Sequence, residues 1–400
     1  MAPIVTAKSP TGRVSLTAAG VARLQQGHLW VFEGQVAAVK GDPKPGDLVD
    51  LIDGRGRWVG RAFYNPKSKI RARLLTTKDE PIDEGFWRGR LQAALRYRER
   101  VVEGASAYRL VHGESDLLPG LIVDRYDALL VVQTLSYGMD VRKQDLAAWL
   151  RELTGAVAVY ERNESGIRSL EGLSRGQGFV LGRAPTLVDI VEGAARFRVD
   201  VAQGQKTGWY CDQRENRLAV AAYAKGARVL EAFCHTGAFG VHAALRGAVS
   251  VEGLDSSEDA VRMARTHAEG NVVTSLCDYR ACDVFEALPA LVRRGARYDL
   301  VILDPPAFAK TKAVLKQAVA GYKQINLRAL QLLEPEGLLV TCSCSHHVSE
   351  EAFWQVVVEA ARDARRPVRL VETRAQSRDH PVLAGMPETK YLKCFIVQAL

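Results

Sequence analysis

One stretch near the middle of the chain limits what it can fold into. Residues 229–240 read Val-Leu-Glu-Ala-Phe-Cys-His-Thr-Gly-Ala-Phe-Gly. Residues 228–232 are predicted to form a short buried strand, and residues 241–246 the helix that follows it. Gly237 and Gly240 flank the turn between them, where the backbone can approach a ligand closely. No Lys-Ser/Thr pair follows the glycines and the three-glycine dinucleotide spacing is incomplete, so the stretch predicts a nucleotide site other than a phosphate loop.

Acidic residues end the next strand-like segments in turn. Residues 248–254 lead into Asp255, about one βα unit beyond the loop, where an acid can bind ribose hydroxyls. Asp283 follows in Ala-Cys-Asp-Val-Phe and is placed to reach an adenine amino group. Residues 298–303 lead into Asp304 and the sequence Asp-Pro-Pro-Ala-Phe. Each motif alone is a weak signal. Four of them in order, each at a strand end, are a strong one.

This series resembles the motifs of class I S-adenosylmethionine (SAM)-dependent methyltransferases. The resemblance implies an α/β fold with a Rossmann-like, seven-stranded methyltransferase domain, and SAM as the cofactor. It assigns cofactor contacts to the loop and strand ends, namely Glu231, Phe233, Thr236, Gly237, Asp255, Asp283 and Asp304. Asp-Pro-Pro-Ala-Phe is the substrate-side motif, in which Pro305 and Pro306 stiffen the loop and Phe308 is placed to stack on a flipped base.

A long motif before the first central strand strengthens the resemblance. Residues 203–216 read Gln-Gly-Gln-Lys-Thr-Gly-Trp-Tyr-Cys-Asp-Gln-Arg-Glu-Asn. In relatives this loop and helix close over the cofactor, so the resemblance gives Lys206, Gly208 and Arg214 as SAM-site or lid residues. Without that context, Arg214 reads as an ordinary charge on a helix surface.

Length and composition indicate an ordinary globular protein of two or three domains. The chain has 400 residues, of which 47% are hydrophobic and 25% charged. The start has no apolar core of signal-peptide length, and no apolar run approaches the ~20 residues that span a bilayer. Seven cysteines without a secretory signal favour reduced thiols. We therefore expect a cytoplasmic location and no membrane partner.

Positive charge is concentrated near the N-terminus. The net charge is +8, and residues 1–80 hold thirteen Lys or Arg against seven Asp or Glu. Residues 55–73 contain no acid and interleave basic with aromatic side chains, a composition that suits RNA because cations neutralise phosphates and rings stack on bases. The candidate RNA-binding residues are Arg57, Arg61, Lys67, Lys69 and Arg71. The alternative is the solvated face of a half-buried strand, since residues 69–74 alternate in polarity.

Three domains are expected, with boundaries at 1–80, 81–190 and 191–400. Short strands separated by Gly, Pro and Asp predict a small β-barrel in the first. Residues 23–32 and 66–68 resemble the PUA RNA-binding domain that opens a family of 23S rRNA methyltransferases. A helix over 83–103, a hairpin over 121–135, a helix over 139–153 and a strand over 157–160 make a small α+β middle domain, in which we see no chemistry. The third is the methyltransferase domain.

The decisive chemistry lies in residues 337–347, Gly-Leu-Leu-Val-Thr-Cys-Ser-Cys-Ser-His-His. An apolar strand here ends in Cys342 and Cys344, at the sheet edge where active sites form. Carbon 5 of a pyrimidine is a poor nucleophile until a thiolate adds to carbon 6 and pushes electron density onto it. Asp304 would hydrogen-bond the N3/N4 edge of cytosine and favour its protonation at N3. Two cysteines at this edge therefore indicate cytosine-5 methylation.

Several readings of the two cysteines remain open. Either one can be a small buried hydrophobe, and a metal site with His346 and His347 lacks a second ligand pair at zinc spacing. By resemblance, Cys344 matches the thiol of the PUA-containing rRNA subgroup, and Cys342 that of broader RNA cytosine-5 methyltransferases. We expect Cys344 to attack, with Cys342 as the alternative.

Over nearly its whole length, the chain resembles the PUA-domain 23S rRNA (cytosine-5)-methyltransferases. The resemblance implies 23S rRNA or a large-subunit precursor as partner, and a homodimer. Near the C-terminus, His380 precedes Pro381 in a segment like the subgroup's closing hairpin, and a structural role is expected for it. Two other functions remain: methylation of guanine N7 or N2, against which the Cys344 motif argues, and a non-catalytic RNA-binding assembly factor, against which the intact loop argues.

Overall fold

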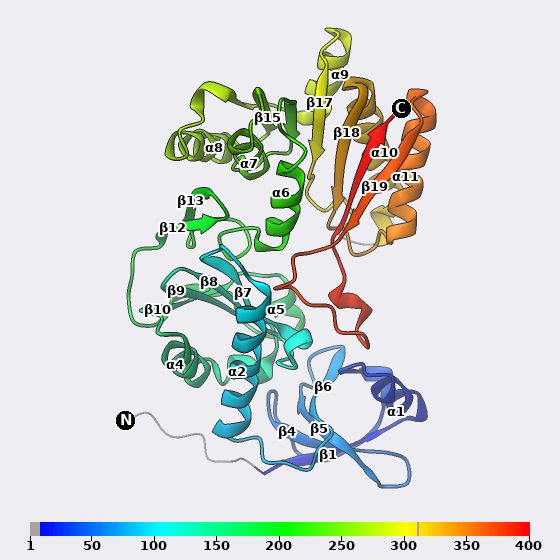
Figure 1. The fold of residues 1–400 in the computed structure, drawn as a ribbon. Coiled ribbons are helices and arrows are strands. Elements are labelled where there is room, and N and C mark those ends of the chain that lie inside the picture. The colour runs from blue at the N-terminus through cyan, green and yellow to red at the C-terminus, as the bar shows by residue number, and fades with distance from the viewer. Residues whose placement is uncertain (1–8, 310–311) are drawn as a thin grey trace. The chain divides into compact units, whose positions relative to one another are not determined.

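The computed structural model describes residues 9–309 and 312–400 (Figure 1). These residues form two compact units, each of which contains segments from separate parts of the chain. The first unit contains the chain up to Ile190 together with Val199–Cys211 and Arg378–Thr389. The second contains Val191–Arg198, Asp212–Ser377 and Lys390–Leu400. The first two expected domains thus lie in one unit, and two segments of the third belong to it as well.

The first unit opens with the small β domain that the short strands predict. Its six strands have the order β2-β6-β5-β4-β1-β3, with β1 parallel to β4 and the other pairs antiparallel. A helix, α1 (Ala18–Gln25), begins at Thr17, whose side chain accepts from the amide of Gly20. The strands are β1 (Gly12–Leu16), β2 (Trp30–Phe32), β3 (Val36–Gly41), β4 (Leu48–Ile52), β5 (Trp58–Tyr64) and β6 (Ile70–Thr76).

A five-stranded sheet follows in the same unit, in the order β11-β10-β9-β8-β7. The strands are β7 (Ala107–His112), β8 (Leu121–Tyr126), β9 (Leu129–Thr134), β10 (Ala158–Asn163) and β11 (Gly176–Leu181). The helices are α2 (Glu84–Val101), α3 (Tyr137–Asp140), α4 (Lys143–Thr154) and α5 (Ile167–Leu170). The expected helix, hairpin, helix and strand are all present, each displaced by a few residues at most.

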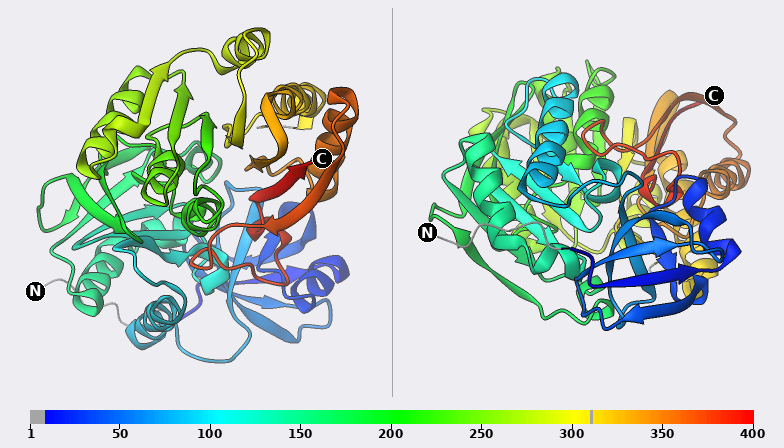
Figure 2. Two further views of the ribbon diagram at one scale, coloured as in Figure 1. Left: turned by 45° about the horizontal axis from the view of Figure 1, so that its top comes forward. Right: turned by 90° about the horizontal axis from the view of Figure 1, so that it is seen from below.

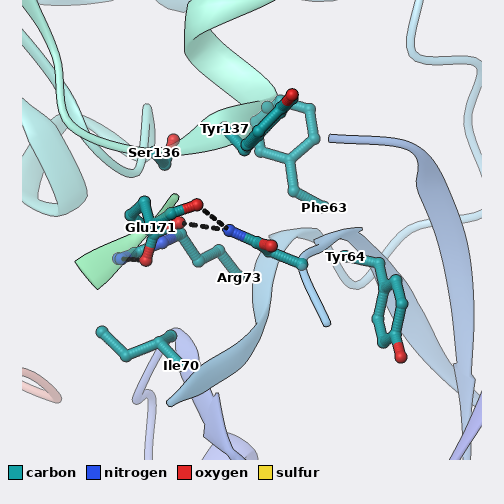
Figure 3. A pocket seen from close by; sticks show the side chains of 9 residues that line it. Phe63, Tyr64, Ile70, Arg73, Ser136, Tyr137 and Glu171 are labelled. Atoms are coloured by element: carbon teal, nitrogen blue, oxygen red, sulfur yellow. Dashed lines mark hydrogen bonds and ion pairs between the residues drawn. The ribbon is translucent and has the colours of Figure 1, made fainter. Parts of the chain in front are cut away.

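The two sheets of the first unit share a core, which explains why they form one unit. Trp87 of α2 is fully buried and stacks on Phe63 of β5, with ring centroids 5.8 Å apart. Beside them Glu171 is buried and accepts from Asn65, Ser68 and Arg73 of the β domain. Figure 3 shows the residues that line a pocket at this place, where Arg73 and Glu171 lie side by side. A shared core and a buried ion pair bind the β domain to the middle domain.

The second unit is a seven-stranded sheet with the order β16-β15-β14-β17-β18-β20-β19. Five neighbouring strands are parallel, and β20 runs antiparallel to β18 and β19. The strands are β14 (Arg228–Ala232), β15 (Ser250–Asp255), β16 (Cys277–Ala281), β17 (Tyr298–Leu303), β18 (Leu333–Ser343), β19 (Val368–Arg374) and β20 (Lys393–Ala399). A hairpin of β12 (Leu187–Glu192) and β13 (Ala195–Asp200) crosses the boundary between the units. The seven-stranded sheet confirms the expected fold class.

Helices cover both faces of this sheet (Figure 1; Figure 2). They are α6 (Arg214–Ala221), α7 (Ala238–Leu245), α8 (Glu258–Gly270), α9 (Val284–Arg293), α10 (Leu315–Leu332) and α11 (Glu350–Ala364). Alternation along the strands divides the core: Leu300 packs with α6, α7 and α8, whereas Val301 packs with α9, α10 and α11. Because helices bury both faces of the sheet, its parallel strands have nearly continuous runs of apolar residues. Among the described helices, none is long and apolar enough to cross a membrane.

Candidate active site

The loop after β14 is shaped by a buried carboxyl and by left-handed backbone. Glu231 accepts from the amides of Phe239 (3.1 Å) and Gly240 (2.9 Å) at the start of α7. Burial raises the pKa of this carboxyl to about 8, against the opposing effect of the two amides. Phe233 (φ 61°), His235 (φ 48°) and Gly237 (φ 73°) are all left-handed. Glu231 therefore holds the helix end that this loop leads into.

A tyrosine that sequence reasoning missed lies under the same loop. A Cβ atom placed on Gly237, Gly240 or Gly253 would approach Tyr279 of β16 to 2.6, 2.7 and 2.1 Å respectively. The Tyr279 hydroxyl donates to the Gly237 carbonyl at 3.1 Å. The glycines are thus needed as much for packing on Tyr279 as for access to a ligand. The only signal was three glycines, two at the start of α7 and one in β15, and nothing in the sequence linked them to this ring.

Asp255 and Asp283 end β15 and follow β16, as expected. Asp255 accepts from the amides of His235 (2.8 Å) and Ser257 (3.0 Å), so its carboxylate ties the β14 loop to the end of its own strand. Asp283 is exposed and caps α9 by accepting from the Phe285 amide at 2.7 Å. The carbonyl of Thr236 lies 2.9 Å from the Nδ1 atom of His267 in α8. All of these loop residues lie at one edge of the sheet.

Asp304 follows β17 and is held by the long motif before α6. Gln213 donates to the Asp304 carboxylate at 2.9 Å, and Asn216 donates to the Gln213 side-chain carbonyl at 2.7 Å. Gln213 is a further candidate site residue, since it orients Asp304. Arg214 beside it is buried, 2% exposed, so the alternative of a helix-surface charge is wrong. It is buried because α6 packs this side chain inward with Asn216 and Arg217.

The two candidate nucleophiles lie in different surroundings. Cys342 is in β18, 0% exposed, and faces Cys394 across the β18–β20 pair. A contact with the Cys394 thiol, together with burial, raises the pKa of Cys342 well above its ordinary value. Cys344 comes directly after β18, on the loop at the strand's carboxyl end, and is half-buried. Buried, protonated Cys342 has the character of a core residue, whereas Cys344 has partial access to solvent.

Hydroxyl groups and aromatic rings surround this strand end. The Tyr322 hydroxyl of α10 lies 3.0 Å from the hydroxyls of both Ser343 and Ser345. Phe308 packs on the Tyr322 ring, with centroids 4.6 Å apart, and also contacts Phe233 and Phe285. Pro305 is buried and Pro306 exposed. Phe308 thus belongs to an aromatic cluster and is only partly exposed. Within the described part of the chain, no three His, Cys, Asp or Glu side chains gather as a metal site would require.

Lys206 and Gly208 lie in the first unit, on Val199–Cys211. The Lys206 ammonium lies 4.4 Å from the centre of the Tyr210 ring. Gly208 is buried with φ 134°, a backbone conformation that favours glycine. Thr207, between them, donates to Asp124 of β8. The middle domain, in which no chemistry was predicted, therefore anchors the segment that the resemblance assigns to the cofactor.

His380 lies in another separate segment of the first unit, Arg378–Thr389. It is buried, its ring is 5.1 Å from that of His112, and its Nδ1 atom is 3.1 Å from Asp379. Asp379 in turn accepts from the Arg109 amide of β7 at 2.8 Å. These contacts give His380 a structural setting inside the first unit.

The basic stretch of the β domain is less uniform than its sequence indicates. Arg73 turns inward to Glu171, so residues 69–74 do not form a simple half-solvated strand. Arg61 pairs with Asp50 at 3.0 Å. The other candidates divide as follows: Arg57 is paired with Asp53 yet exposed, Arg71 is paired with Glu33 and half-buried, and Lys67 and Lys69 are exposed. The alternation failed at Arg73 because the middle domain covers that face of β6.

Strand order and strand-end loops make the second unit a class I SAM-dependent methyltransferase domain. In such sheets the ligand lies beyond the carboxyl ends of the strands, where the order reverses, here between β14 and β17. The residues present fit an adenosyl nucleoside: the β14 loop brings its backbone to this edge, and Asp255 and Asp283 follow the next two strands. The geometry thus agrees with SAM.

Comparisons with known proteins agree. Residues 14–77 match a PUA-like domain, and residues 109–392 match an S-adenosylmethionine-dependent methyltransferase. Relatives named ribosomal RNA large subunit methyltransferase I include one from Tolumonas auensis, 42% identical over 93% of this chain and 96% of its own. A relative of the same name from Escherichia coli O139:H28 is 39% identical over 93% of this chain and 96% of its own length.

Solved structures share the fold. One from Streptococcus mutans, described as a SAM-dependent methyltransferase, covers 96% of this chain and 99% of its own at 20% identity and a TM-score of 0.82. A second solved structure, described as a methyltransferase complexed with S-adenosylhomocysteine, has the same coverage and a TM-score of 0.83. The chain belongs to the S-adenosylmethionine-dependent methyltransferase family, with an N-terminal PUA-like domain, and its cofactor is SAM.

Proposed function

We propose that this protein methylates carbon 5 of a cytosine in 23S rRNA, with Cys344 as the nucleophile. The observation that carries the proposal is the position of Cys344 directly after β18, next to the strand that leads into Asp304. The alternative nucleophile, Cys342, is fully buried and its thiol is held protonated. The substrate follows from the relatives, which are named for methylation of large-subunit ribosomal RNA.

Each residue has a role in the proposed reaction. The Cys344 thiolate adds to carbon 6, so a sulfur–carbon bond forms and the electron pair moves toward carbon 5. Asp304, oriented by Gln213, hydrogen-bonds the N3/N4 edge of the base. When bound, SAM would supply an electrophilic methyl group for carbon 5 and leave as S-adenosylhomocysteine. Loss of the carbon 5 proton to water then expels Cys344 as a thiolate and restores the aromatic ring.

Cofactor contacts are proposed for residues at the sheet edge and in the segment Val199–Cys211. They are Glu231, Phe233, Thr236, Gly237, Asp255, Asp283, Asp304, Lys206, Gly208 and Arg214. Glu231, already bonded to two amides, acts by shaping the loop. Asp255 has the position expected for a ribose acid. For the RNA, exposed Lys67 and Lys69 are the better candidates of the basic stretch, because Arg61 and Arg71 are engaged in ion pairs.

The test compares Cys344→Ala with Cys342→Ala. Each protein is incubated with labelled SAM and an unmodified 23S rRNA transcript, and the product nucleosides are identified. We expect 5-methylcytidine from the parent and from Cys342→Ala, and none from Cys344→Ala. A transcript with 5-fluorocytidine should form a stable covalent adduct with the parent protein and none with Cys344→Ala. The adduct persists because fluorine does not leave carbon 5 as the proton does.

Other results would contradict the proposal in distinct ways. Loss of activity with Cys342→Ala alone would keep the reaction and move the nucleophile. Full activity in both variants, with a methylated guanine as product, would exclude the thiol mechanism. SAM binding by every variant without methylation of any rRNA would favour an assembly factor.

A further inference from the structure

A buried lysine at the start of β20 carries a charge that the site has so far left unexplained. Lys393 is 5% exposed, and its ammonium donates to the carbonyls of Ser345 (2.7 Å) and Tyr391 (2.9 Å). Among the residues that the structure describes, no carboxylate oxygen lies within 4.0 Å of this ammonium. A buried cation bonded to neutral carbonyls is costly unless a negative charge is near.

The β18–β20 pair brings this ammonium to the nucleophile loop. Lys393 lies opposite Ser343 in the antiparallel register, and Cys344 is the next residue after Ser343. The carbonyl that Lys393 holds belongs to Ser345, on the other side of Cys344. Burial lowers the pKa of Lys393 to about 8; the charge of a Cys344 thiolate is the largest effect that opposes this shift, and the carboxylate of Glu350 adds to it. The charged forms of the two side chains therefore favour each other.

The other ionisable groups around this loop do not supply the same charge. Tyr322 of α10 is a neutral phenol whose pKa burial raises. His346, on the loop itself, has its pKa lowered by burial, Lys393 and His347, which favours neutral imidazole. Lys390 is exposed and pairs at 2.6 Å with Glu350 of α11. Asp304, beyond β17, is negative and would oppose a thiolate rather than stabilise it.

We propose that Lys393 is a positioning residue for the nucleophile: its ammonium stabilises the thiolate of Cys344 and, through the Ser345 carbonyl, holds the loop that presents it. The ionisation involves one bond, since the sulfur–hydrogen bond of Cys344 breaks and the proton passes to solvent. The inference rests on the proposed function only for what the thiolate then does, which is to add to carbon 6. The stabilisation itself requires no RNA or SAM.

Alkylation of Cys344 by iodoacetamide tests the inference without substrate. Only the thiolate displaces iodide, so the rate at each pH, measured by mass spectrometry of the Cys344 peptide, follows the thiolate fraction. For the parent we expect half the maximal rate below pH ~8.5, the ordinary value for a free thiol. Lys393→Met should slow alkylation at pH 7 about tenfold, which corresponds to a pKa rise of about one unit. Lys393→Arg, which keeps the charge, should recover most of the rate.

Lys390→Met is the matched control, because it removes a cation three residues away that is exposed and already paired. It should alkylate as the parent does. Thermal unfolding and SAM binding by each variant show whether the fold is kept. Equal Cys344 alkylation profiles in the parent and in folded Lys393→Met would overturn the inference. If Lys393→Met does not fold, the parent profile decides, and a midpoint at or above pH ~8.5 overturns it.

Methylation assays separate this inference from the proposed function. If Lys393→Met slows both alkylation and kcat, with KM for RNA unchanged and kcat recovering at higher pH, both proposals are supported. If alkylation slows and methylation does not change, Lys393 stabilises the thiolate and the proposed role of that thiolate fails. Slower methylation with unaltered alkylation contradicts the inference and leaves the role of Cys344 standing.

Discussion

At the scale of single residues, the active-site loop depends on what lies beneath it as well as on its own sequence. Gly237 and Gly240 were predicted from a turn that must approach a ligand. The structure adds Gly253, on the neighbouring strand, and the Tyr279 ring on which all three pack. A glycine in a strand interior usually marks such a close approach. The cofactor loop therefore packs on Tyr279, which lies on β16, two strands away from β14.

Gly253→Ala tests this packing on Tyr279. Its Cβ atom would lie 2.1 Å from the Tyr279 ring, so we expect a loss of unfolding free energy of about 1–3 kcal/mol by overpacking, measured in urea. Gly270→Ala is the control, because nothing lies within 4 Å of its Cβ position at the end of α8. Adding Tyr279→Leu to Gly253→Ala should make the pair less destabilising than the sum of the single changes. If the two changes in unfolding free energy were strictly additive, the added methyl group would not contact the Tyr279 ring.

At the scale of elements, strand β8 anchors a segment distant in sequence. The Tyr126 hydroxyl lies 2.9 Å from the Thr207 hydroxyl and accepts from the Trp209 amide at 3.1 Å. Asp124 binds Thr207 and receives two hydrogen bonds from Arg109. These bonds are buried, so each lost partner leaves a polar group unpaired at a cost of about 1–3 kcal/mol. The middle domain therefore holds the segment that contains Lys206 and Gly208.

Tyr126→Phe should loosen this segment while leaving its surroundings packed. We expect hydrogen exchange of the amides from Thr207 to Trp209 to accelerate about tenfold, the equivalent of ~1.4 kcal/mol. Tyr160→Phe, on β10 of the same sheet, is the control. Its ring packs on Phe179 at 5.0 Å, and the change removes a hydroxyl elsewhere. Equal exchange in the two variants would mean that the Tyr126 hydroxyl does not anchor the segment.

At the scale of the molecule, the β domain and the middle domain share one hydrophobic core, so we expect them to unfold together. The ion pair of Arg73 and Glu171 is its polar part, with side chains 7% and 3% exposed and atoms 2.8 Å apart. Removing Glu171 leaves buried Arg73 with only Glu114, 3.2 Å away, as a carboxylate partner, whereas removing both members of a buried pair can be nearly neutral. The pair thus links β6 of the β domain to the middle domain.

Glu171→Gln should therefore destabilise the first unit by about 3 kcal/mol, the low end for a broken buried pair because Arg73 keeps Glu114, and Arg73→Met/Glu171→Leu by much less. Glu84→Gln is the control, since its ion pair with Arg88 lies at the surface, with side chains 37% and 25% exposed, and is worth ~1 kcal/mol or less. Urea unfolding monitored by tryptophan fluorescence measures all of them. If Glu171→Gln were no worse than Glu84→Gln, the buried pair would not join the domains.

Local sequence determined the elements and the family. Apolar runs predicted the central strands, and β14 and β17 have the predicted bounds because such runs can be buried only inside a covered parallel sheet. Acids at strand ends and the Gly237 turn predicted the cofactor edge, because the loops after parallel strands meet at one edge of a sheet. These signals are short-range, and the residues that carry them need no distant partner to be recognised.

Tertiary structure alone decided which side chains meet. Arg73 looked like part of a basic RNA surface, and only the fold of the middle domain turns it toward Glu171. Tyr279 carried no motif, and Lys393 belonged only to the segment that resembles a closing hairpin, yet each lies against an active-site loop through strand pairing. Cys342 and Cys344, two residues apart in the sequence, differ because one lies within β18 opposite β20 and the other beyond its end. Burial and electrostatic partners are set by contacts between segments far apart in the chain, which no local pattern records.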